Sequence, residues 1–214
     1  MISNRINNGL NGNPIIPGDK SISHRSIIIP SISNGICEVK NFLKSDDVIN
    51  TLNAFTLMGV KVEEKNNSLL IYGEGLNSLK KPDKDIYLGN SGTSARLLTG
   101  LLSSQNFSST LTGDSSLSSR PMDRISKPLA SMSAKILTNK GCMPINIIGR
   151  KLISTEIDII IPSAQIKSGL ILAALNTNGT TKIIENNVTR DHTEIMLDYF
   201  DANISVKKEG NKKI

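Results

Sequence analysis

The sequence predicts an α/β protein built from three repeated units, because three similar segments recur at nearly regular spacing. Each segment is a polar loop that follows an extended apolar stretch and opens a helical one. The three loops span Pro17–Arg25, Leu88–Arg96 and Pro162–Ser168. Aligning Lys20 with Ser91 and Gln165 places the copies 71 and 74 residues apart. We therefore expect a pseudo-threefold repeat of β-α-β-α-β-β units, over about residues 14–73, 86–149 and 157–206.

The first unit shows its pattern most clearly after its loop. Ser45 is a good N-cap, and the acidic Asp46 and Asp47 suit the first turn of a helix. Apolar residues follow at helical spacing. Two short strands are then expected, at Val60–Val62 and Leu69–Tyr72.

The second and third units repeat this order with less complete signals. In the second unit we expect a helix over Arg120–Ile136, broken or kinked at Pro128, and a strand at Asn146–Ile148. In the third unit we expect a helix over Asp191–Phe200 and a strand at Ile204–Val206. No second strand is recognisable after it, so the third unit is predicted to be incomplete.

The net charge is modest once its distribution is considered. The chain carries 25 Lys and Arg residues against 19 Asp and Glu residues, a formal charge of +6. Four of the lysines fall within residues 207–214, which we expect to form a basic tail with a truncated strand. The remaining excess of positive charge is compatible with a small anionic substrate, and it is equally compatible with no anionic partner at all.

Composition argues against several classes of function. With no Trp, 3 Tyr and 4 Phe, the chain cannot provide the aromatic platform of a single-strand nucleic-acid binder. The longest apolar run, Leu170–Leu175, is far shorter than the roughly 20 residues of a membrane span, and no secretory signal is recognisable. Cys37 and Cys142 provide neither a disulfide framework nor a zinc site. We expect two reduced thiols in a cytoplasmic protein.

The polar loops carry the features of anion sites. Each would present free backbone N–H groups and the positive end of a helix dipole. Basic residues lie in or beside the loops or the starts of the second helices: Lys20, Arg25, Arg96, Arg120, Lys167 and Arg190. No Walker A or dinucleotide-binding pattern is present, and neither His24 nor His192 has a partner at metal-ligand spacing. We expect ligand hydrogen bonds from Ser21, a structural hydrogen bond from His24, no metal and no cofactor.

Five motifs together resemble the EPSP synthase (3-phosphoshikimate 1-carboxyvinyltransferase) family, and they occur in that family's order. They are Pro17–Arg25, Gly89–Thr93 with Arg96, Ser119–Met122, Ser163–Ser168 and Arg190–Glu194. The resemblance implies one domain of the inside-out α/β barrel of the enolpyruvyl transferases. It covers essentially the whole chain but only the N-terminal half of the usual enzyme. The C-terminal catalytic domain is therefore expected to be absent, and to be supplied in cis or in trans.

The resemblance also implies an activity. The family enzyme transfers the enolpyruvyl group of phosphoenolpyruvate to the 5-hydroxyl of shikimate 3-phosphate and releases phosphate, on the way to chorismate and the aromatic amino acids. It implies a cytoplasmic transferase, monomeric when complete, that has two phosphorylated small-molecule substrates and no nucleic-acid or membrane partner. The acid–base residues of the family come from the second domain, so we expect little or no turnover by this chain alone.

Roles for individual residues follow from the same resemblance. Shikimate 3-phosphate would be held by Lys20, Ser21, Arg25, Ser163, Ala164, Gln165 and Arg190. Lys20 would also reach phosphoenolpyruvate and is the one residue given a catalytic role, that of positioning. Gly92 and Arg120 would contact phosphoenolpyruvate. Supporting positions would be Asn90, Thr93, Arg96 and Lys167.

Two other interpretations remain open from the sequence. The chain could be an anion-binding module without catalysis, or a relative of UDP-N-acetylglucosamine enolpyruvyl transferase. The UDP-N-acetylglucosamine enolpyruvyl transferase family lacks the run found here at Asp19–Arg25 in its first loop. That family also uses a reactive cysteine in a mobile loop, whereas Cys142 of this chain stands in a different sequence context. Nucleic-acid binding, the simplest interpretation of a pI near 9.3, is disfavoured by the shortage of aromatic residues.

Overall fold

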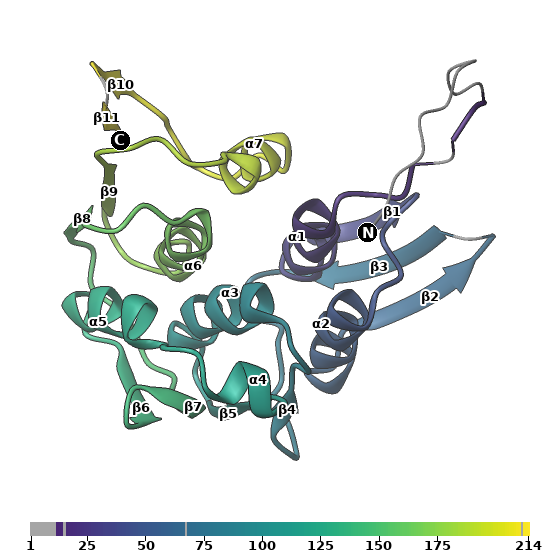
Figure 1. Ribbon diagram of the computed structural model, residues 1–214, viewed down its shortest axis with the longest axis horizontal. Helices are drawn as coiled ribbons and strands as arrows, with labels where there is room; N and C mark the ends of the chain where they lie inside the picture. Colours follow the sequence, from purple (N-terminus) through teal and green to yellow (C-terminus); the bar gives the residue numbers. More distant parts are fainter. Residues whose placement is uncertain (1–11, 15, 67, 211) are drawn as a thin grey trace, which may run out of the picture.

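The computed structural model describes residues 12–14, 16–66, 68–210 and 212–214, arranged as a mixed α/β fold (Figure 1). Among these residues, three β-sheets lie on the outside of the molecule. The helices that follow the polar loops lie toward the inside; they are α1 (Lys20–Ser31), α3 (Gly92–Ser103) and α6 (Ala164–Ala174). No helix in this described part of the chain is long and apolar enough to cross a membrane.

The first sheet packs against α1 and α2 and agrees well with the expected elements. Its strands pair in the order β1-β3-β2, all antiparallel. Leu69 and Ile71 of the central strand are buried in the core. Ile15, part of the extended stretch expected before the first loop, lies outside the described residues, and residues 12–14 and 16–19 carry no strand. The elements are β1 (Asn34–Val39), α2 (Asp46–Leu57), β2 (Lys61–Lys65) and β3 (Ser68–Glu74).

The second sheet has the order β4-β5-β7-β6. Within this sheet β4 and β5 pair in parallel, whereas β5 with β7 and β6 with β7 pair antiparallel. Its elements are β4 (Ile86–Tyr87), β5 (Ser108–Thr112), α4 (Ser115–Ser118), α5 (Asp123–Ser131), β6 (Lys135–Asn139) and β7 (Cys142–Ile148). The helix expected over 120–136, with a break or kink at Pro128, was wrong in its bounds, and α5 runs through Pro128. The helix α5 ends at Ser131, Ser133 turns the chain with a positive φ of 66°, and Ile136 lies in β6. Lys140 and Gly141 then close a hairpin with φ values of 50° and 78°.

The third sheet has the order β10-β11-β9-β8. Its elements are β8 (Glu156–Ile159), β9 (Lys182–Glu185), α7 (His192–Tyr199), β10 (Lys208–Glu209) and β11 (Lys212–Lys213). The expected strand at 204–206 was wrong, because those residues lie between α7 and β10. The basic segment 207–214 is not a free tail, since β11 pairs with β9 and thereby adds strands to the unit that we expected to be incomplete.

Two glycines allow α3 and α6 to approach closely. A Cβ atom on Gly100 would lie 1.9 Å from the carbonyl oxygen of Gly169, and a Cβ on Gly169 would lie 2.7 Å from the carbonyl oxygen of Arg96. Both distances are far below van der Waals contact, so only glycine fits at either position. This approach places the start of α6 beside the start of α3.

Candidate functional site

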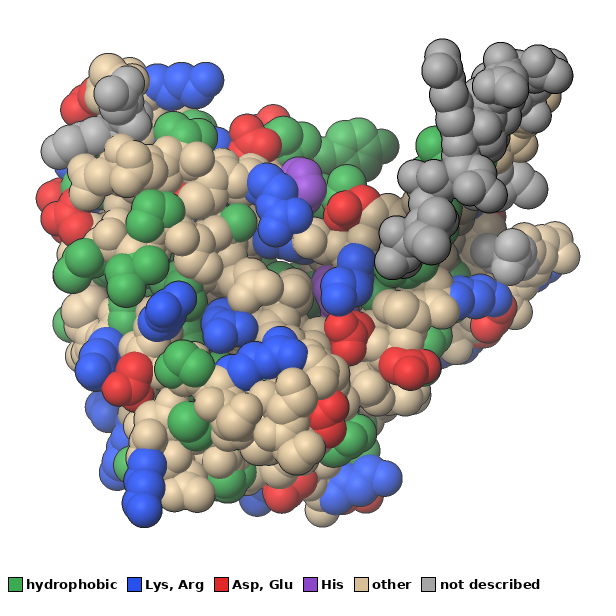
Figure 2. Space-filling view, in the orientation of Figure 1, with side chains coloured by type: hydrophobic (Ala, Val, Ile, Leu, Met, Phe, Trp, Pro, Cys, Tyr) green, Lys and Arg blue, Asp and Glu red, His purple; other side chains and the backbone are tan. Residues whose placement is uncertain are grey.

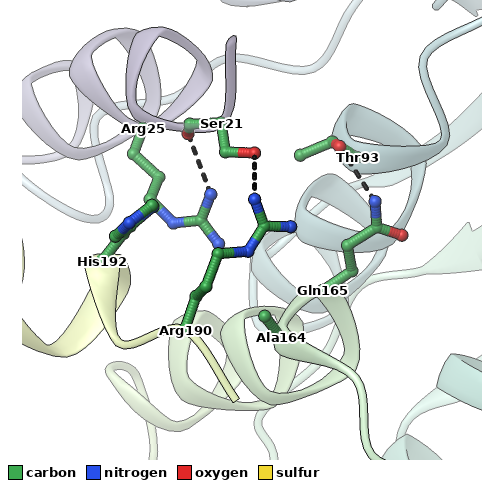
Figure 3. A pocket seen from close by; sticks show the side chains of 7 residues that line it. All are labelled: Ser21, Arg25, Thr93, Ala164, Gln165, Arg190 and His192. Atoms are coloured by element: carbon green, nitrogen blue, oxygen red, sulfur yellow. Dashed lines mark hydrogen bonds between the residues drawn. The ribbon is translucent and has the colours of Figure 1, made fainter. Parts of the chain in front are cut away.

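The starts of α1, α3 and α6 and the segment before α7 surround one pocket (Figure 3). Its lining residues are Ser21, Arg25, Thr93, Ala164, Gln165, Arg190 and His192. The pocket therefore brings together residues of all three predicted loops and of the Arg190 motif. Lys and Arg side chains gather around the middle of this face of the molecule (Figure 2).

A side chain caps each of the three inner helices, which explains why the loops end where they do. Asp19 Oδ1 accepts the N–H of Ile22 at 2.8 Å at the start of α1. Ser91 caps α3, and Ser163 caps α6. The capping oxygens take one free N–H of each helix and leave other N–H groups of the first turn without a helical partner.

Arg25 is the buried cation of the pocket. Only 4% of its surface is exposed. Burial lowers the pKa of its guanidinium to about 10, although the nearby Glu194 carboxylate raises it. None of the ion pairs in the described part of the chain includes Arg25. A buried cation without a carboxylate partner is costly, and an anionic ligand would relieve that cost.

Arg190 and Ser21 lie opposite the second and third loops. Arg190 is exposed, and its Nη1 lies 3.5 Å from Ser21 Oγ. Gln165 Nε2 donates to Thr93 Oγ1 at 3.0 Å, and Arg96 Nη1 donates to Gln165 Oε1 at 3.1 Å. The amide of Gln165 is thus oriented from both ends by the second loop.

Arg96 and Arg120 flank Gly92 in the second loop. Arg120 donates to Asn90 Oδ1, and Asn90 Nδ2 donates to Asp114 Oδ2 at 2.9 Å. Burial lowers the pKa of Arg96, and the neighbouring positive charges of Arg120 and Arg124 lower it further. These guanidinium groups are close enough to repel one another, so an anion between them would be favoured.

Substituting Gly92 with alanine tests how closely these two arginines approach the loop. The added Cβ would lie 2.8 Å from Arg96 Nη1 and 3.0 Å from Arg120 Nη1. Both atoms are the ends of flexible side chains, so we expect the free energy of unfolding to change by less than about 0.5 kcal/mol. The Nε–H signals of Arg96 and Arg120 in a two-dimensional NMR spectrum should shift. Unchanged signals in Gly92→Ala would contradict this geometry.

Two of the predicted site lysines do not line the pocket. Lys20 stands at the start of α1 and pairs with Asp47 at 3.0 Å, with 53% of its side chain exposed. Lys167 was expected to support the anion site, but its ammonium is buried between Glu185 at 2.7 Å and Glu194 at 2.8 Å. The charge of Lys167 is thus neutralised by two buried carboxylates within the fold.

His24 has the structural role that the sequence indicated. Its Nδ1 lies 2.8 Å from Thr51 Oγ1, which lies 2.5 Å from Ser94 Oγ, and Ser91 Oγ completes the chain at 2.6 Å. This buried chain joins α1, α2 and α3. Burial lowers the pKa of His24 to about 4, against a smaller opposing effect of the Asp47 carboxylate.

The lowered pKa of His24 predicts a pH-dependent stability. In the unfolded chain the imidazole binds a proton below about pH 6.5, whereas the folded protein binds it only near pH 4. Stability should therefore fall as the pH falls through this window, by about 3 kcal/mol in total. Urea unfolding at pH 7.5, 6, 5 and 4 measures this slope. The His24→Asn variant should show a smaller slope, and equal slopes in both proteins would contradict the assignment.

Sequence reasoning missed three residues around Arg25. His192 lines the pocket, and Ser168 and Thr193 hold the Arg25 guanidinium. Ser168 and Thr193 stand inside motifs that were recognised, but no spacing rule could show that they meet Arg25, 143 and 168 residues away in the chain.

Comparison with known proteins identifies the family. The family model described as EPSP synthase (3-phosphoshikimate 1-carboxyvinyltransferase) matches residues 5–214. A 3-phosphoshikimate 1-carboxyvinyltransferase of Ruthia magnifica is 48% identical over 202 residues, which cover 94% of this chain and 46% of the relative. One of Oenococcus oeni is 48% identical over 198 residues, covering 92% and 45%.

A solved structure gives the same result. The EPSP synthase of Acinetobacter baumannii superposes with a TM-score of 0.88 at 49% sequence identity, covering 94% of this chain and 46% of that one. The chain spans about half the length of the curated relatives that it matches. Because the family model matches residues 5–214 and these relatives are nearly half identical to it, the chain belongs to the EPSP synthase family.

Proposed function

We propose that this chain forms the shikimate 3-phosphate half of a 3-phosphoshikimate 1-carboxyvinyltransferase. The complete enzyme would transfer the enolpyruvyl group of phosphoenolpyruvate to the 5-hydroxyl of shikimate 3-phosphate and release phosphate. The observation that carries the proposal is the buried Arg25 guanidinium, which lines a pocket with Arg190 and the start of α6. Two guanidinium groups and a helix N-terminus are a set that recognises a phosphorylated carboxylic acid.

The two substrates would occupy neighbouring parts of the site. Shikimate 3-phosphate would contact Lys20, Ser21, Arg25, Ser163, Ala164, Gln165 and Arg190. Phosphoenolpyruvate would lie toward Gly92 and Arg120, and Lys20 would reach it after leaving Asp47. Asn90, Thr93 and Arg96 would support the second loop, since they hold Arg120 and Gln165 in place.

We also propose that the three sheets and their helices are three repeated units of one substrate-binding domain. Each inner helix is preceded by a polar loop and capped by a side chain, which supports this interpretation. The remaining length of the relatives would correspond to a catalytic domain, acting in cis or in trans. The complete enzyme would be a cytoplasmic monomer without a cofactor.

Catalysis requires more than this pocket offers. A proton must reach the methylene carbon of phosphoenolpyruvate, a base must accept the hydroxyl proton, and phosphate must then leave a tetrahedral intermediate. The described residues lining the pocket include two guanidinium groups, two hydroxyls, an amide and the His192 imidazole, which is the one acid–base group among them, but no carboxylate. We therefore propose substrate binding for this chain and negligible turnover in the absence of a complementary half.

Ligand discrimination in solution tests the proposal. On addition of shikimate 3-phosphate, the backbone amide signals of Ser21, Ala164, Gln165 and Arg190 should shift and saturate. Shikimate or inorganic phosphate alone should produce the same shifts only at much higher concentration. Equal affinity for inorganic phosphate would instead favour a general anion-binding module, and shifts outside the pocket would place the site elsewhere.

A further inference from the structure

The guanidinium of Arg25 is held along one edge by hydroxyl groups from two other helices. Its Nε donates to Thr193 Oγ1 of α7 at 2.6 Å, and its Nη2 donates to Ser168 Oγ of α6 at 2.6 Å. All three residues are at least 96% buried, Arg25 at 4% exposure and the other two at 1% each. A single planar group thus joins α1, α6 and α7 behind the pocket.

The hydrogen bonds of the two hydroxyls have a fixed direction. Thr193 Oγ1 donates to Ser168 Oγ at 2.6 Å, and Ser168 Oγ donates to the carbonyl oxygen of Ala164 at 2.6 Å. Each hydroxyl has one proton, and both protons are used in this chain. Their lone pairs are therefore left to accept the N–H groups of Arg25.

This arrangement decides which N–H groups of Arg25 remain free. A guanidinium has five N–H donors. One goes to Thr193, one to Ser168, and one, on Nη1, to the backbone carbonyl of Ser21 at 2.9 Å. One N–H on each terminal nitrogen is left, and these two can bind two oxygens of one anionic group.

Ion pairs connect the first turn of α7, which carries Thr193, to neighbouring elements. The carboxylate of the next residue, Glu194, forms ion pairs with Lys167 at 2.8 Å and with Lys213 at 3.2 Å. Lys213 also pairs with Asp191 at 3.3 Å. Because β11 carries Lys213, the third sheet anchors the turn that presents Thr193 to Arg25.

We propose that Thr193 is a positioning residue for shikimate 3-phosphate, whose hydroxyl, backed by Ser168, sets the rotation of the Arg25 guanidinium. This inference rests on the function proposed above. Valine has nearly the same shape as threonine, but it would place a methyl group against the buried Nε–H of Arg25. The guanidinium would then turn toward another acceptor, and its free N–H pair would no longer face the pocket.

The test compares Thr193→Val, Thr193→Ser and Thr56→Val. Thr56 is an exposed threonine whose hydroxyl donates to the carbonyl of Leu52 within its own helix, so Thr56→Val controls for the substitution itself. Calorimetric titration with shikimate 3-phosphate should give about tenfold weaker binding for Thr193→Val. Thr193→Ser and Thr56→Val should bind as the unchanged protein does.

A second measurement needs no ligand. The Nε–H signal of Arg25 in a two-dimensional NMR spectrum should move in Thr193→Val and stay in place in Thr193→Ser. If Thr193→Val does not fold, Ser168→Ala replaces it in both measurements. This second variant removes the hydroxyl that accepts the hydrogen bond of Arg25 Nη2.

The outcomes distinguish the positioning role of Thr193 from the proposed binding of shikimate 3-phosphate by this chain. Wild-type affinity in folded Thr193→Val, or an unmoved Arg25 signal, overturns the positioning role. A wild-type chain that fails to bind shikimate 3-phosphate contradicts the proposed function instead, while the Arg25 signal still decides the role of Thr193.

Discussion

Replacing Lys167 with methionine is expected to lower the free energy of unfolding by about 3–5 kcal/mol. The Lys167 side chain is 4% exposed and those of Glu185 and Glu194 are 2% and 7% exposed. Without the ammonium group, one buried carboxylate loses its ion pair and the other keeps only Lys213. Urea unfolding followed by circular dichroism measures the loss.

The pair Lys182 and Glu156 provides a matched control for this substitution. It joins the same two residue types at 3.2 Å, but the side chains are 43% and 58% exposed. Lys182→Met should therefore cost no more than about 1 kcal/mol. Adding Glu185→Gln to Lys167→Met should restore part of the stability, because it removes a buried charge. Equal effects of the two lysine substitutions would contradict the buried network.

Replacing Gly100 with alanine is expected to destabilise the fold by about 3 kcal/mol, at the upper end of the cost of overpacking. The new Cβ would meet the carbonyl oxygen of Gly169 at 1.9 Å and its carbonyl carbon at 2.5 Å. These are backbone atoms of α6, so the helices must separate. Separation should also pull Gln165 away from Thr93 and weaken binding of shikimate 3-phosphate.

Gly92→Ala is the control for this prediction, since its Cβ would meet only side-chain atoms. Urea unfolding of both variants provides the comparison of stability, and calorimetric titration of Gly100→Ala with shikimate 3-phosphate measures the loss of binding. If Gly100→Ala were as stable as Gly92→Ala, the close approach of α3 and α6 would be incorrect.

The sequence predicted the parts of the site that depend on local chemistry. The polar loops were recognisable from their repeat, and Ser21, Arg25, Ala164, Gln165 and Arg190 do line one pocket. The helix start expected after Ser45 was found at Asp46, although the Ser45 side chain accepts no hydrogen bond from the first turn of α2. Local signals of this kind can be read from the chain alone.

What the sequence could not predict depends on contacts between distant segments. Lys167 lies in a polar loop motif, and only the fold shows that it turns toward Glu185 and Glu194. The hydroxyl of Thr193 acts on Arg25 only because α1, α6 and α7 meet. The helix predicted over 120–136 was too long because Ser133 turns the chain with a positive φ and the residues from Lys135 onward pair with β7.

Calorimetric titration of the 214-residue chain with shikimate 3-phosphate tests the central claim most directly. We expect saturable binding that is weakened in both Arg25→Ala and Lys20→Ala, and more strongly in Arg25→Ala because Arg25 lines the pocket. Lys61→Ala, which removes an exposed lysine of the first sheet paired with Glu63, should bind normally. Absence of binding by the folded wild-type chain, or equal binding by Arg25→Ala, would contradict a preformed shikimate 3-phosphate site.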